Sequence, residues 1–444
     1  MIAAENLTLL TDLYQLTMAQ AYFREQQMGE ATFSLFIRSY PPNRGYFVAA
    51  GLQDVEDYLE SLHFDQPELD YLASLSLFSD DFLHYLAGLH FTGKVLALPE
   101  GRVFFVDEPI LELTAPIIEA QIVETFVINQ IHFQTLVATK AARCVHAAGA
   151  RPVVDFALRR THGSDAGMKV ARASYLAGFA GTSNVMAGRR DTLPLVGTMA
   201  HSFVSSFERE TDAFRAYVAS FPNTAILLID TYDTLTGARN AVQVGREMAA
   251  RGEKLLGVRI DSGDLKGLAV EVRRILDDAG LQDAKIIGSG GLDEFDLARL
   301  STAPYDSYGV GTKMGVSADA PFTDIAYKLV EFQNRGVMKL SSGKASWPGK
   351  KQVFRQKNDS GRLEEDIIGL REEPLVGESL LKVVMGDGRT LAPHPTLREA
   401  RETLAADLAA LPESAKAIHE PSRVAVEFSP GLKALREEIA KKSA

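Results

Sequence analysis

L-L-G-V-R-I-D-S-G-D-L, at Leu255–Leu265, is the stretch from which the fold of the central chain can be inferred. It begins as a short, mainly apolar run and changes at Asp261 to charged and small polar residues. Strands of parallel sheets have this composition because helices cover both of their faces. The loops that follow such strands are where α/β proteins bind their ligands. We therefore expect a buried parallel strand that leads into a functional loop.

Similar apolar runs recur along the middle of the chain and alternate with amphipathic helical segments. The strand candidates are Val153–Leu158, Leu195–Met199, Ala225–Ile229, Leu255–Ile260, Lys285–Gly288 and Ser307–Val310, with a weaker one at Gly181–Val185. Repeated strand and helix units predict a parallel sheet. This many strands in residues 149–325 predict an irregular α/β barrel, and an open doubly wound sheet is the alternative.

The two ends of the chain predict a separate α+β domain. Residues 1–148 suggest a helix at Thr11–Gln26, a strand at Ala31–Arg38, a small antiparallel sheet at Gly93–Thr114 and a long helix from Pro116 to about Ala148. From Ala326 the chain is β-rich again, in Y-K-L-V-E-F and V-M-K-L-S, and passes through S-W-P-G-K-K into a charged helical tail. We expect residues 326–444 to complete the N-terminal domain.

Charge and composition limit the possible partners. Lys and Arg total 47 against 58 Asp and Glu, a net charge of −11, which disfavours nucleic acid as a partner. A local cluster of cations and backbone N–H groups can still bind a small anion. Hydrophobic residues make up 46% and charged residues 24%, as in soluble globular proteins.

The compartment is expected to be the cytoplasm. The N-terminal sequence M-I-A-A-E-N-L-T-L-L-T-D lacks the basic and apolar regions of a signal peptide, and no long uncharged apolar window predicts a membrane span. The single cysteine, Cys144, cannot form an internal disulfide, and we expect it to be a buried structural thiol.

Polar residues follow each expected strand. They are Arg159, Arg160, Thr161 and His162; Thr182, Ser183 and Asn184; His201 and Ser202; Asp230; Asp261, Ser262, Gly263 and Asp264; Gly290 and Gly291; and Gly311, Thr312 and Lys313. A solvated rim would also be polar, so no one of these loops indicates function. Their succession at one edge of a parallel sheet favours a ligand site.

Two glycine-rich loops, G-S-G-G at Gly288–Gly291 and G-V-G-T at Gly309–Thr312, suit phosphate because backbone N–H groups can approach it without hindrance from a Cβ. Tight turns are the other interpretation. Asp261 could hold Mg²⁺ with phosphate oxygens as further ligands. Arg259, two residues before Asp261, points to the same side of the strand as Asp261. It could bind a carboxylate of a ligand, or could form an internal ion pair with Asp261.

The ordered motifs are T-D-L-Y-Q-L-T-M (Thr11–Met18), E-P-I-L-E-L, E-T-F-V-I-N-Q, A-T-K-A-A-R (Ala138–Arg143), F-A-L-R-R (Phe156–Arg160), G-T-S-N (Gly181–Asn184), G-T-M-A-H-S (Gly197–Ser202), G-V-R-I-D-S-G-D-L, G-S-G-G and Y-G-V-G-T. In this order they resemble the nicotinate phosphoribosyltransferase family, as far as about Arg355. The resemblance implies a type II phosphoribosyltransferase, an irregular α/β barrel with an α+β N-terminal domain, working in NAD synthesis as a homodimer with shared active sites. It also implies that nicotinate and phosphoribosyl pyrophosphate are substrates, that ATP is a co-substrate, and that Mg²⁺ is a cofactor.

The resemblance further implies roles for single residues. Tyr14, contributed by the neighbouring chain, and Phe156 would sandwich the pyridine ring, and Asp261 would lie near the ribose and metal. On electrostatic grounds, the neutral Ser183 beside Arg259 would favour the carboxylate of nicotinate. Arg159, Gly290, Gly291, Gly311 and Thr312 match positions that hold the ribose phosphate and pyrophosphate. His201 matches the histidine that ATP phosphorylates. His162 and Ser164 lie in a segment that varies in the family and receive no role.

Three other functions are weighed. A nicotinamide phosphoribosyltransferase would have an Asp at the position of Ser183, where a neutral residue favours nicotinate. A non-catalytic nucleotide sensor on the same barrel would be expected to lack His201, Asp261 or the glycine pairs. A barrel aldolase or isomerase would need a Schiff-base lysine, for which Lys313 is the candidate.

Overall fold

The computed structural model describes residues 6–341 and 346–443. Residues 1–5, part of the N-terminal stretch inspected for a signal peptide, lie outside this range, as does residue 444 at the end of the expected tail. Contacts divide the chain into unit 1, Met1–Thr139 with Ala320–Ala444, and unit 2, Lys140–Asp319. The sequence placed these boundaries at 148/149 and 325/326. No helix within the described residues has the length and apolar composition needed to cross a membrane.

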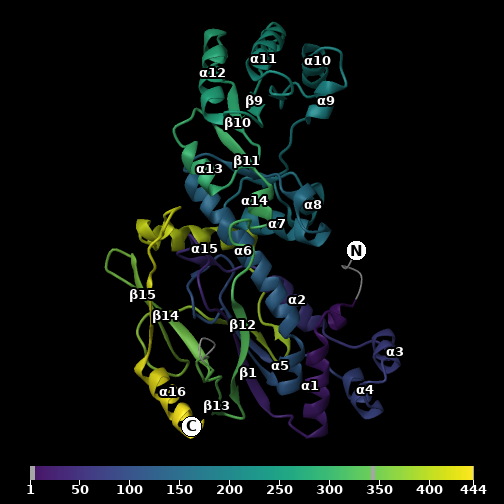
Figure 1. Ribbon diagram of the computed structural model, residues 1–444, viewed down its shortest axis with the longest axis vertical. Helices are drawn as coiled ribbons and strands as arrows, with labels where there is room; N and C mark the ends of the chain where they lie inside the picture. Colours follow the sequence, from purple (N-terminus) through teal and green to yellow (C-terminus); the bar gives the residue numbers. More distant parts are fainter. Residues whose placement is uncertain (1–5, 342–345, 444) are drawn as a thin grey trace. The chain divides into compact units, whose positions relative to one another are not determined.

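Unit 2 is built on a parallel sheet (Figure 1). Its strands are β6 (Val153–Asp155), β7 (Gly181–Thr182), β8 (Ile226–Leu228), β9 (Gly257–Ile260), β10 (Lys285–Gly288) and β11 (Ser307–Val310), in the order β7-β6-β11-β10-β9-β8. The helices are α7 (Ser164–Leu176), α8 (Val185–Asp191), α9 (His201–Ser205), α10 (Glu210–Ser220), α11 (Thr234–Ala249), α12 (Leu265–Asp278), α13 (Glu294–Arg299) and α14 (Thr312–Gly315), with the 3₁₀ turn η3 (Leu158–Arg160). The predicted α/β class is therefore confirmed.

The strand predictions agree most closely with the structure at β10 and β11. β10 and β11 have the bounds expected from the sequence, whereas β6 ends at Asp155 because its carboxylate accepts a hydrogen bond from the N–H of Ala157, 2.8 Å away, and starts a turn. The strand expected at Leu195–Met199 is wrong and is reduced to one bridge between Thr182 and Leu195. No pairing among the described residues joins β8 to this segment, so the barrel is open there.

Unit 1 contains mainly antiparallel sheets formed by both ends of the chain, with one parallel pair between Leu363–Leu370 and Ala425–Phe428. The main sheet has the order β13-β12-β1-β5-β3-β17-β18, from β1 (Glu30–Ile37), β3 (Lys94–Ala97), β5 (Leu111–Pro116), β12 (Ile325–Phe332), β13 (Arg335–Gly336), β17 (Lys382–Gly386) and β18 (Arg389–Thr390). A second sheet, β16-β14-β15-β19, has β14 (Lys351–Lys357), β15 (Leu363–Leu370), β16 (Glu378–Ser379) and β19 (Ala425–Phe428). A third pairs β2 (Phe47–Val48) with β4 (Val103–Phe104). Strands from beyond Ala320 thus complete the N-terminal domain, as the fold prediction states.

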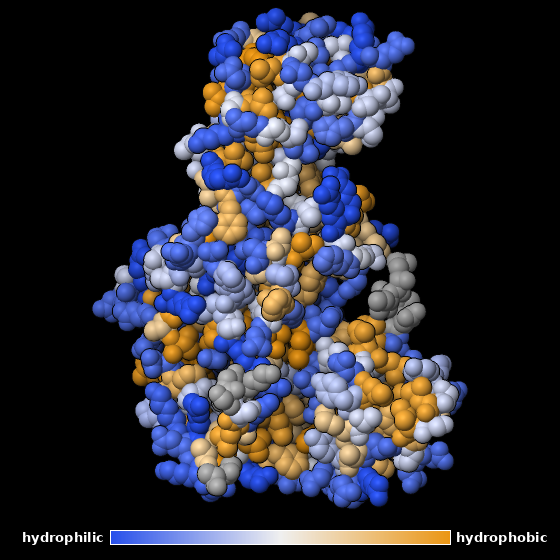
Figure 2. Space-filling view, in the orientation of Figure 1, coloured by the Kyte–Doolittle hydropathy of each residue, from blue (hydrophilic) through white to orange (hydrophobic). Residues whose placement is uncertain are grey.

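Several helices of unit 1 pack against strands of these sheets (Figure 1). The helices of the unit are η2 (Leu7–Leu9), α1 (Leu13–Arg24), α2 (Leu52–Ser61), α3 (Gln66–Ser74), α4 (Asp80–Ala87), α5 (Ile117–Ile122), α6 (Glu124–Ala148), α15 (Leu397–Ala410), η4 (Glu413–Lys416) and α16 (Pro430–Ser443); α6 continues into unit 2. The predicted helix from Pro116 to Ala148 is two helices that meet at Val123. The core includes Phe33 of β1, which stacks on Tyr327 of β12 at 4.8 Å between ring centroids. An apolar surface area of this unit lies over α3 and α4 (Figure 2).

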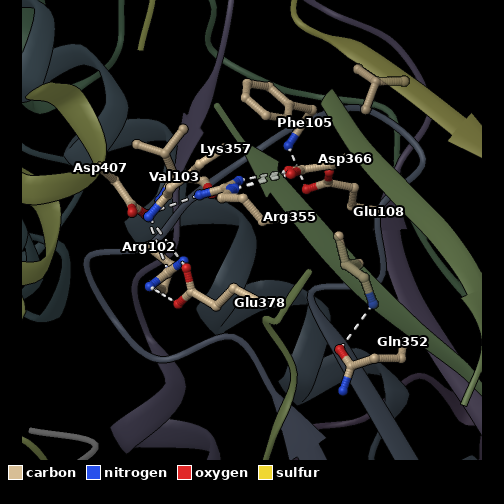
Figure 3. A network of polar contacts seen from close by, with 12 residues as sticks. Arg102, Val103, Phe105, Glu108, Gln352, Arg355, Lys357, Asp366, Glu378 and Asp407 are labelled. Carbon is tan, nitrogen blue, oxygen red and sulfur yellow. Dashed lines mark hydrogen bonds and ion pairs between the residues drawn. The ribbon is translucent and has the colours of Figure 1, made fainter. Parts of the chain in front are cut away.

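A buried network of charged side chains joins strands of unit 1 to α15 (Figure 3). Arg355 on β14 is 2% exposed, and its Nε and Nη2 donate to the carboxylate of Asp366 on β15 at 3.0 and 2.7 Å. Its Nη1 donates to Asp407 of α15 at 3.2 Å. Burial and the neighbouring Asp366 raise the pKa of Glu108 well above its ordinary value, while Arg355 opposes this effect. These buried polar residues replace the apolar alternation that predicts strands, which explains why the sequence indicated only a helical tail here.

Candidate active site

The carboxyl ends of β8, β9 and β10 hold two carboxylates close together. Asp230, directly after Ile229, is 8% exposed, and its Oδ2 accepts hydrogen bonds from the N–H of Asp261 at 2.9 Å and the hydroxyl of Ser262 at 2.6 Å. Its Oδ1 is buried without a hydrogen-bond partner among the described residues. Oδ1 of Asp261 accepts from the hydroxyl of Ser289 at 2.6 Å. An acidic corner with an unsatisfied oxygen is therefore present where the sequence placed Asp261.

Arg259 reaches from β9 toward an aromatic ring. Its guanidinium carbon lies 5.9 Å from the ring centroid of Phe156, within the range of cation–π attraction. Nη1 donates to the hydroxyl of Thr198 at 2.7 Å and Nη2 to the carbonyl of Met199 at 3.0 Å, while Nε is buried and unpaired within the described chain. Burial lowers the pKa of Arg259, although nearby Asp261 opposes this effect. The internal ion pair with Asp261 considered above is not formed.

A cavity of about 370 Å³ collects most of the expected pyridine-binding residues. It is lined by Phe156, Leu158, Arg159, Ser183, Gly197, Thr198, Met199, Ala200, His201, Arg259 and Asp261. The aromatic face of Phe156, the cation of Arg259 and the neutral Ser183 suit a flat heterocycle that carries an anionic group. Arg159 is exposed and has no ion-pair partner within the described residues, so its charge is available to a ligand.

His201 begins the short helix α9 and lines the same cavity. Its Nδ1 lies 3.1 Å from the hydroxyl of Thr231, and Nε2 has no hydrogen-bond partner in the part of the chain that the structure describes. The imidazole is half-buried. One ring nitrogen is thus fixed by the protein and the other is open to a ligand, an arrangement that suits a phosphoryl acceptor better than a purely structural histidine.

The glycine loop after β10 lines a second cavity, of about 740 Å³, together with Lys266, Arg299 and Lys313. Gly290 has φ 98°, and a Cβ on it would lie 1.8 Å from the carbonyl oxygen of Asp261. Gly291 has φ 68° and open space around it. Only glycine fits the first position, and the second leaves its backbone accessible. This geometry is compatible with phosphate binding and also with a tight turn.

The loop after β11 is shaped by the ring that follows β6. A Cβ on Gly309 would lie 2.5 Å from the ring of Phe156, and one on Gly311 would lie 2.9 Å from the carbonyl oxygen of Phe156. Gly311 caps α14, whose first residue is Thr312. Lys313 pairs with Asp296 at 2.8 Å and Asp293 at 3.4 Å; burial lowers its pKa, but these carboxylates outweigh burial and raise it. A lysine kept protonated is unsuited to Schiff-base chemistry.

Other residues stand apart or were missed. Tyr14 lies on α1 in unit 1 and is 49% exposed. The sequence puts Asp230 on the polar rim without a role and Ser289 in a glycine loop. Thr198 was placed inside an expected strand. The usable signal for Asp230 was an acid directly after a fully apolar strand, but hydrogen bonds between strands distant in sequence cannot be read from spacing.

Comparison with known proteins agrees with these features. Residues 9–132 match the model of the nicotinate phosphoribosyltransferase (NAPRTase) N-terminal domain, residues 152–345 that of the nicotinate phosphoribosyltransferase family and residues 376–436 that of the C-terminal domain. Nicotinate phosphoribosyltransferase pncB2 of Mycobacterium tuberculosis is 50% identical over 415 residues, 93% of this chain and 89% of the relative. The chain belongs to the nicotinate phosphoribosyltransferase family.

Two further members of the nicotinate phosphoribosyltransferase family extend the comparison. The nicotinate phosphoribosyltransferase of Bacillus subtilis is 39% identical over 390 residues, 85% of this chain and 79% of the relative. The crystal structure of human nicotinic acid phosphoribosyltransferase superposes with a TM-score of 0.88 at 29% identity and covers 97% of this chain and 99% of that one. The similarity to the family therefore extends over both units.

Proposed function

We propose that this chain transfers the phosphoribosyl group of phosphoribosyl pyrophosphate to nicotinate, forming nicotinate mononucleotide and pyrophosphate. The observation that carries the proposal is the placement of Arg259 beside Phe156 in a 370 Å³ cavity next to the glycine loops. Arg259 suits the carboxylate and Phe156 the ring, while the loops suit the phosphates. Membership of the family supports the same reaction.

The residues act by orientation and charge. The ring nitrogen of nicotinate attacks C1 of the sugar while the bond from C1 to the pyrophosphate oxygen breaks, so the electron pair leaves with pyrophosphate. No covalent protein nucleophile is required. Phe156 and Arg259 align the ring, and Gly290, Gly291, Gly311 and Thr312, with Arg159, hold the phosphates of the donor.

Asp261 fits a Mg²⁺ ion, and the unpaired Oδ1 of neighbouring Asp230 adds a second carboxylate oxygen at the same corner. Hard oxygen ligands of this kind are preferred by Mg²⁺, with phosphate oxygens completing its coordination. The ion would supply positive charge to the departing pyrophosphate. The residues themselves set the position of the carboxylates.

ATP is proposed as co-substrate through His201. Nε2 would take the γ-phosphoryl group as ADP leaves, and water would later cleave the phosphorus–nitrogen bond to give inorganic phosphate. The contact of Nδ1 with Thr231 supports this choice because it leaves Nε2 open. A homodimer is also proposed, in which Tyr14 of one chain would cover the ring bound to Phe156 of the other.

The test is a side-by-side assay of the purified chain with nicotinate and nicotinamide, phosphoribosyl pyrophosphate and Mg²⁺, with and without ATP. Nicotinate mononucleotide should form, faster with ATP, and nicotinamide should be used poorly because Ser183 supplies no carboxylate for an amide N–H. Preference for nicotinamide would support the rival transferase, and no turnover with either would support a non-catalytic protein.

A further inference from the structure

Ser289, in the first glycine loop, is buried where a hydroxyl is needed to satisfy a carboxylate. It directly follows β10 and is 2% exposed, and its N–H donates to the carbonyl of Ile260 at 2.9 Å. Its Oγ lies 2.6 Å from Oδ1 of Asp261 and 3.4 Å from the carbonyl oxygen of Ile260. A hydroxyl has one hydrogen to donate, and the shorter contact to a carboxylate is the stronger one. The hydroxyl is therefore committed to Asp261.

The backbone of Asp261 is fixed independently of Ser289. Its N–H donates to Asp230 at 2.9 Å, and its carbonyl oxygen lies where Gly290 leaves no room for a Cβ. Only the side-chain torsions remain to be set. Within the described residues, the hydroxyl of Ser289 is the sole hydrogen-bond partner of this carboxylate. With Oδ1 held toward β10, Oδ2 is the oxygen left for the cavity that Asp261 lines.

We propose that Ser289 is a positioning residue of the transfer reaction, which holds Oδ1 of Asp261 so that Oδ2 faces phosphoribosyl pyrophosphate and its metal ion. The proposal rests on the proposed function for its substrate. Ser289 acts through Asp261 and not through contact with the pyridine ring. Loss of the hydroxyl should therefore affect steps that depend on phosphoribosyl pyrophosphate and leave recognition of nicotinate unchanged.

Three variants separate hydrogen bonding from packing. Ser289→Ala removes the hydroxyl, Ser289→Cys keeps most of the volume but has a weak donor, and Ser289→Thr retains the hydroxyl. Ser174→Ala is the matched control. Ser174 is fully buried in α7 of the same unit, and within the described residues its hydroxyl donates only to the carbonyl of Ala171, at 3.2 Å. Thermal melts of all variants monitor folding.

We expect Ser289→Ala and Ser289→Cys to lower kcat about ten- to hundredfold, the cost of one hydrogen bond to a charged group. The Mg²⁺ concentration for half-maximal rate should rise. The KM for nicotinate should stay within about twofold of the wild-type value, because the contacts to the ring are unchanged. Ser289→Thr should recover most of the rate, and Ser174→Ala should match wild type. A Cys variant as active as wild type would overturn the proposal, because packing alone would then suffice.

A double-mutant cycle tests whether Ser289 acts through Asp261. Binding of phosphoribosyl pyrophosphate with Mg²⁺ is measured by calorimetry for wild type, Ser289→Ala, Asp261→Ala and the double variant. Ser289→Ala should weaken binding in the wild-type background and have no further effect when Asp261 is absent. Equal loss in both backgrounds would refute the positioning role. If the wild type binds the donor but makes no nicotinate mononucleotide, the proposed function fails, while the cycle still decides the role of Ser289.

Discussion

Arg259 has two nitrogens held by Thr198 and Met199 and a third buried without a partner in the described chain. We expect Arg259→Ala to raise the KM for nicotinate or lower kcat/KM by the equivalent of about 2–4 kcal/mol, because a bidentate contact to a carboxylate is lost. The KM for phosphoribosyl pyrophosphate should change little. Steady-state kinetics with each substrate varied provide the measurement, and Arg239→Ala, an exposed arginine on α11, is the control. Unchanged nicotinate kinetics would contradict the carboxylate assignment.

Ser183 lines the same cavity as Arg259 and carries no charge. Ser183→Asp should penalise nicotinate and relatively favour nicotinamide, because a carboxylate repels the acid and accepts a hydrogen bond from the amide. The ratio of kcat/KM values for the two substrates is the measure, with Ser183→Ala as the neutral control. If the aspartate leaves this ratio unchanged, Ser183 is not near the ring substituent.

The role of His201 distinguishes an ATP-driven enzyme from a transferase that does not use ATP. His201→Ala should abolish ATP hydrolysis linked to product formation and leave a slower, uncoupled transfer, because attack on C1 does not require the imidazole. ADP and nicotinate mononucleotide formed per unit time are compared for wild type and variant, with acid-labile, base-stable phosphate on the protein as a second readout. Coupling at the wild-type ratio in the folded variant would return His201 to a structural role.

At the scale of elements, the two glycines of the loop after β10 should respond differently to substitution, because Gly290 is closely packed and Gly291 has open space around it. Gly290→Ala should misfold or strongly destabilise unit 2, because its Cβ would overlap the carbonyl of Asp261. Gly291→Ala has open space and should cost only about 1–2 kcal/mol for its left-handed backbone, yet raise the KM for phosphoribosyl pyrophosphate. Urea unfolding and substrate kinetics together measure this difference. An unaltered donor KM in Gly291→Ala would argue against phosphate at this loop.

The same scale shows what the sequence could predict. β10 and β11 were located correctly because each is a short, mainly apolar run that is followed directly by a glycine-rich loop. The Arg259 and Phe156 pair could be expected from strand-end position and resemblance. The contacts of Thr198 and Ser289 could not, since each joins segments that are distant in the sequence. β14 and β15 were missed because Lys351, Arg355 and Asp366 are buried in them as paired charges. Ion pairing reverses the usual relation between polarity and exposure.

At the scale of the whole molecule, the network around Arg355 holds unit 1 together (Figure 3). Asp407→Ala removes the carboxylate of a residue that is only 4% exposed. This carboxylate accepts hydrogen bonds from the N–H of Val103 at 2.9 Å and from Arg355. The substitution leaves the buried Arg355 and the N–H of Val103 without this acceptor, and it should lower the free energy of unfolding by about 3–5 kcal/mol. Fluorescence of the single tryptophan, Trp347, which stacks on Phe428, follows unfolding of this unit in urea.

The control for Asp407 is Asp324→Ala. Its partner Arg38 lies 3.3 Å away, and the Asp324 side chain is 54% exposed, so the loss should stay below about 1 kcal/mol. Equal shifts in the urea midpoints of the two variants would mean that the buried network contributes no more than a surface pair. Unchanged m-values would show that the compactness of the unfolded state is the same in each case.

The pairing of β1 with β12 also governs the order of events during synthesis on the ribosome. Ala31 pairs with Phe332, so one edge of β1 waits for a partner made roughly 300 residues later, which takes about 15–60 s at the usual elongation rates. Every segment of unit 2 is translated within that interval. The nascent chain therefore carries an unpaired strand edge while the parallel sheet can already form, and an unpaired edge is a template for association with other chains. Slower elongation before Ile325 would lengthen this exposure and should increase the requirement for chaperones.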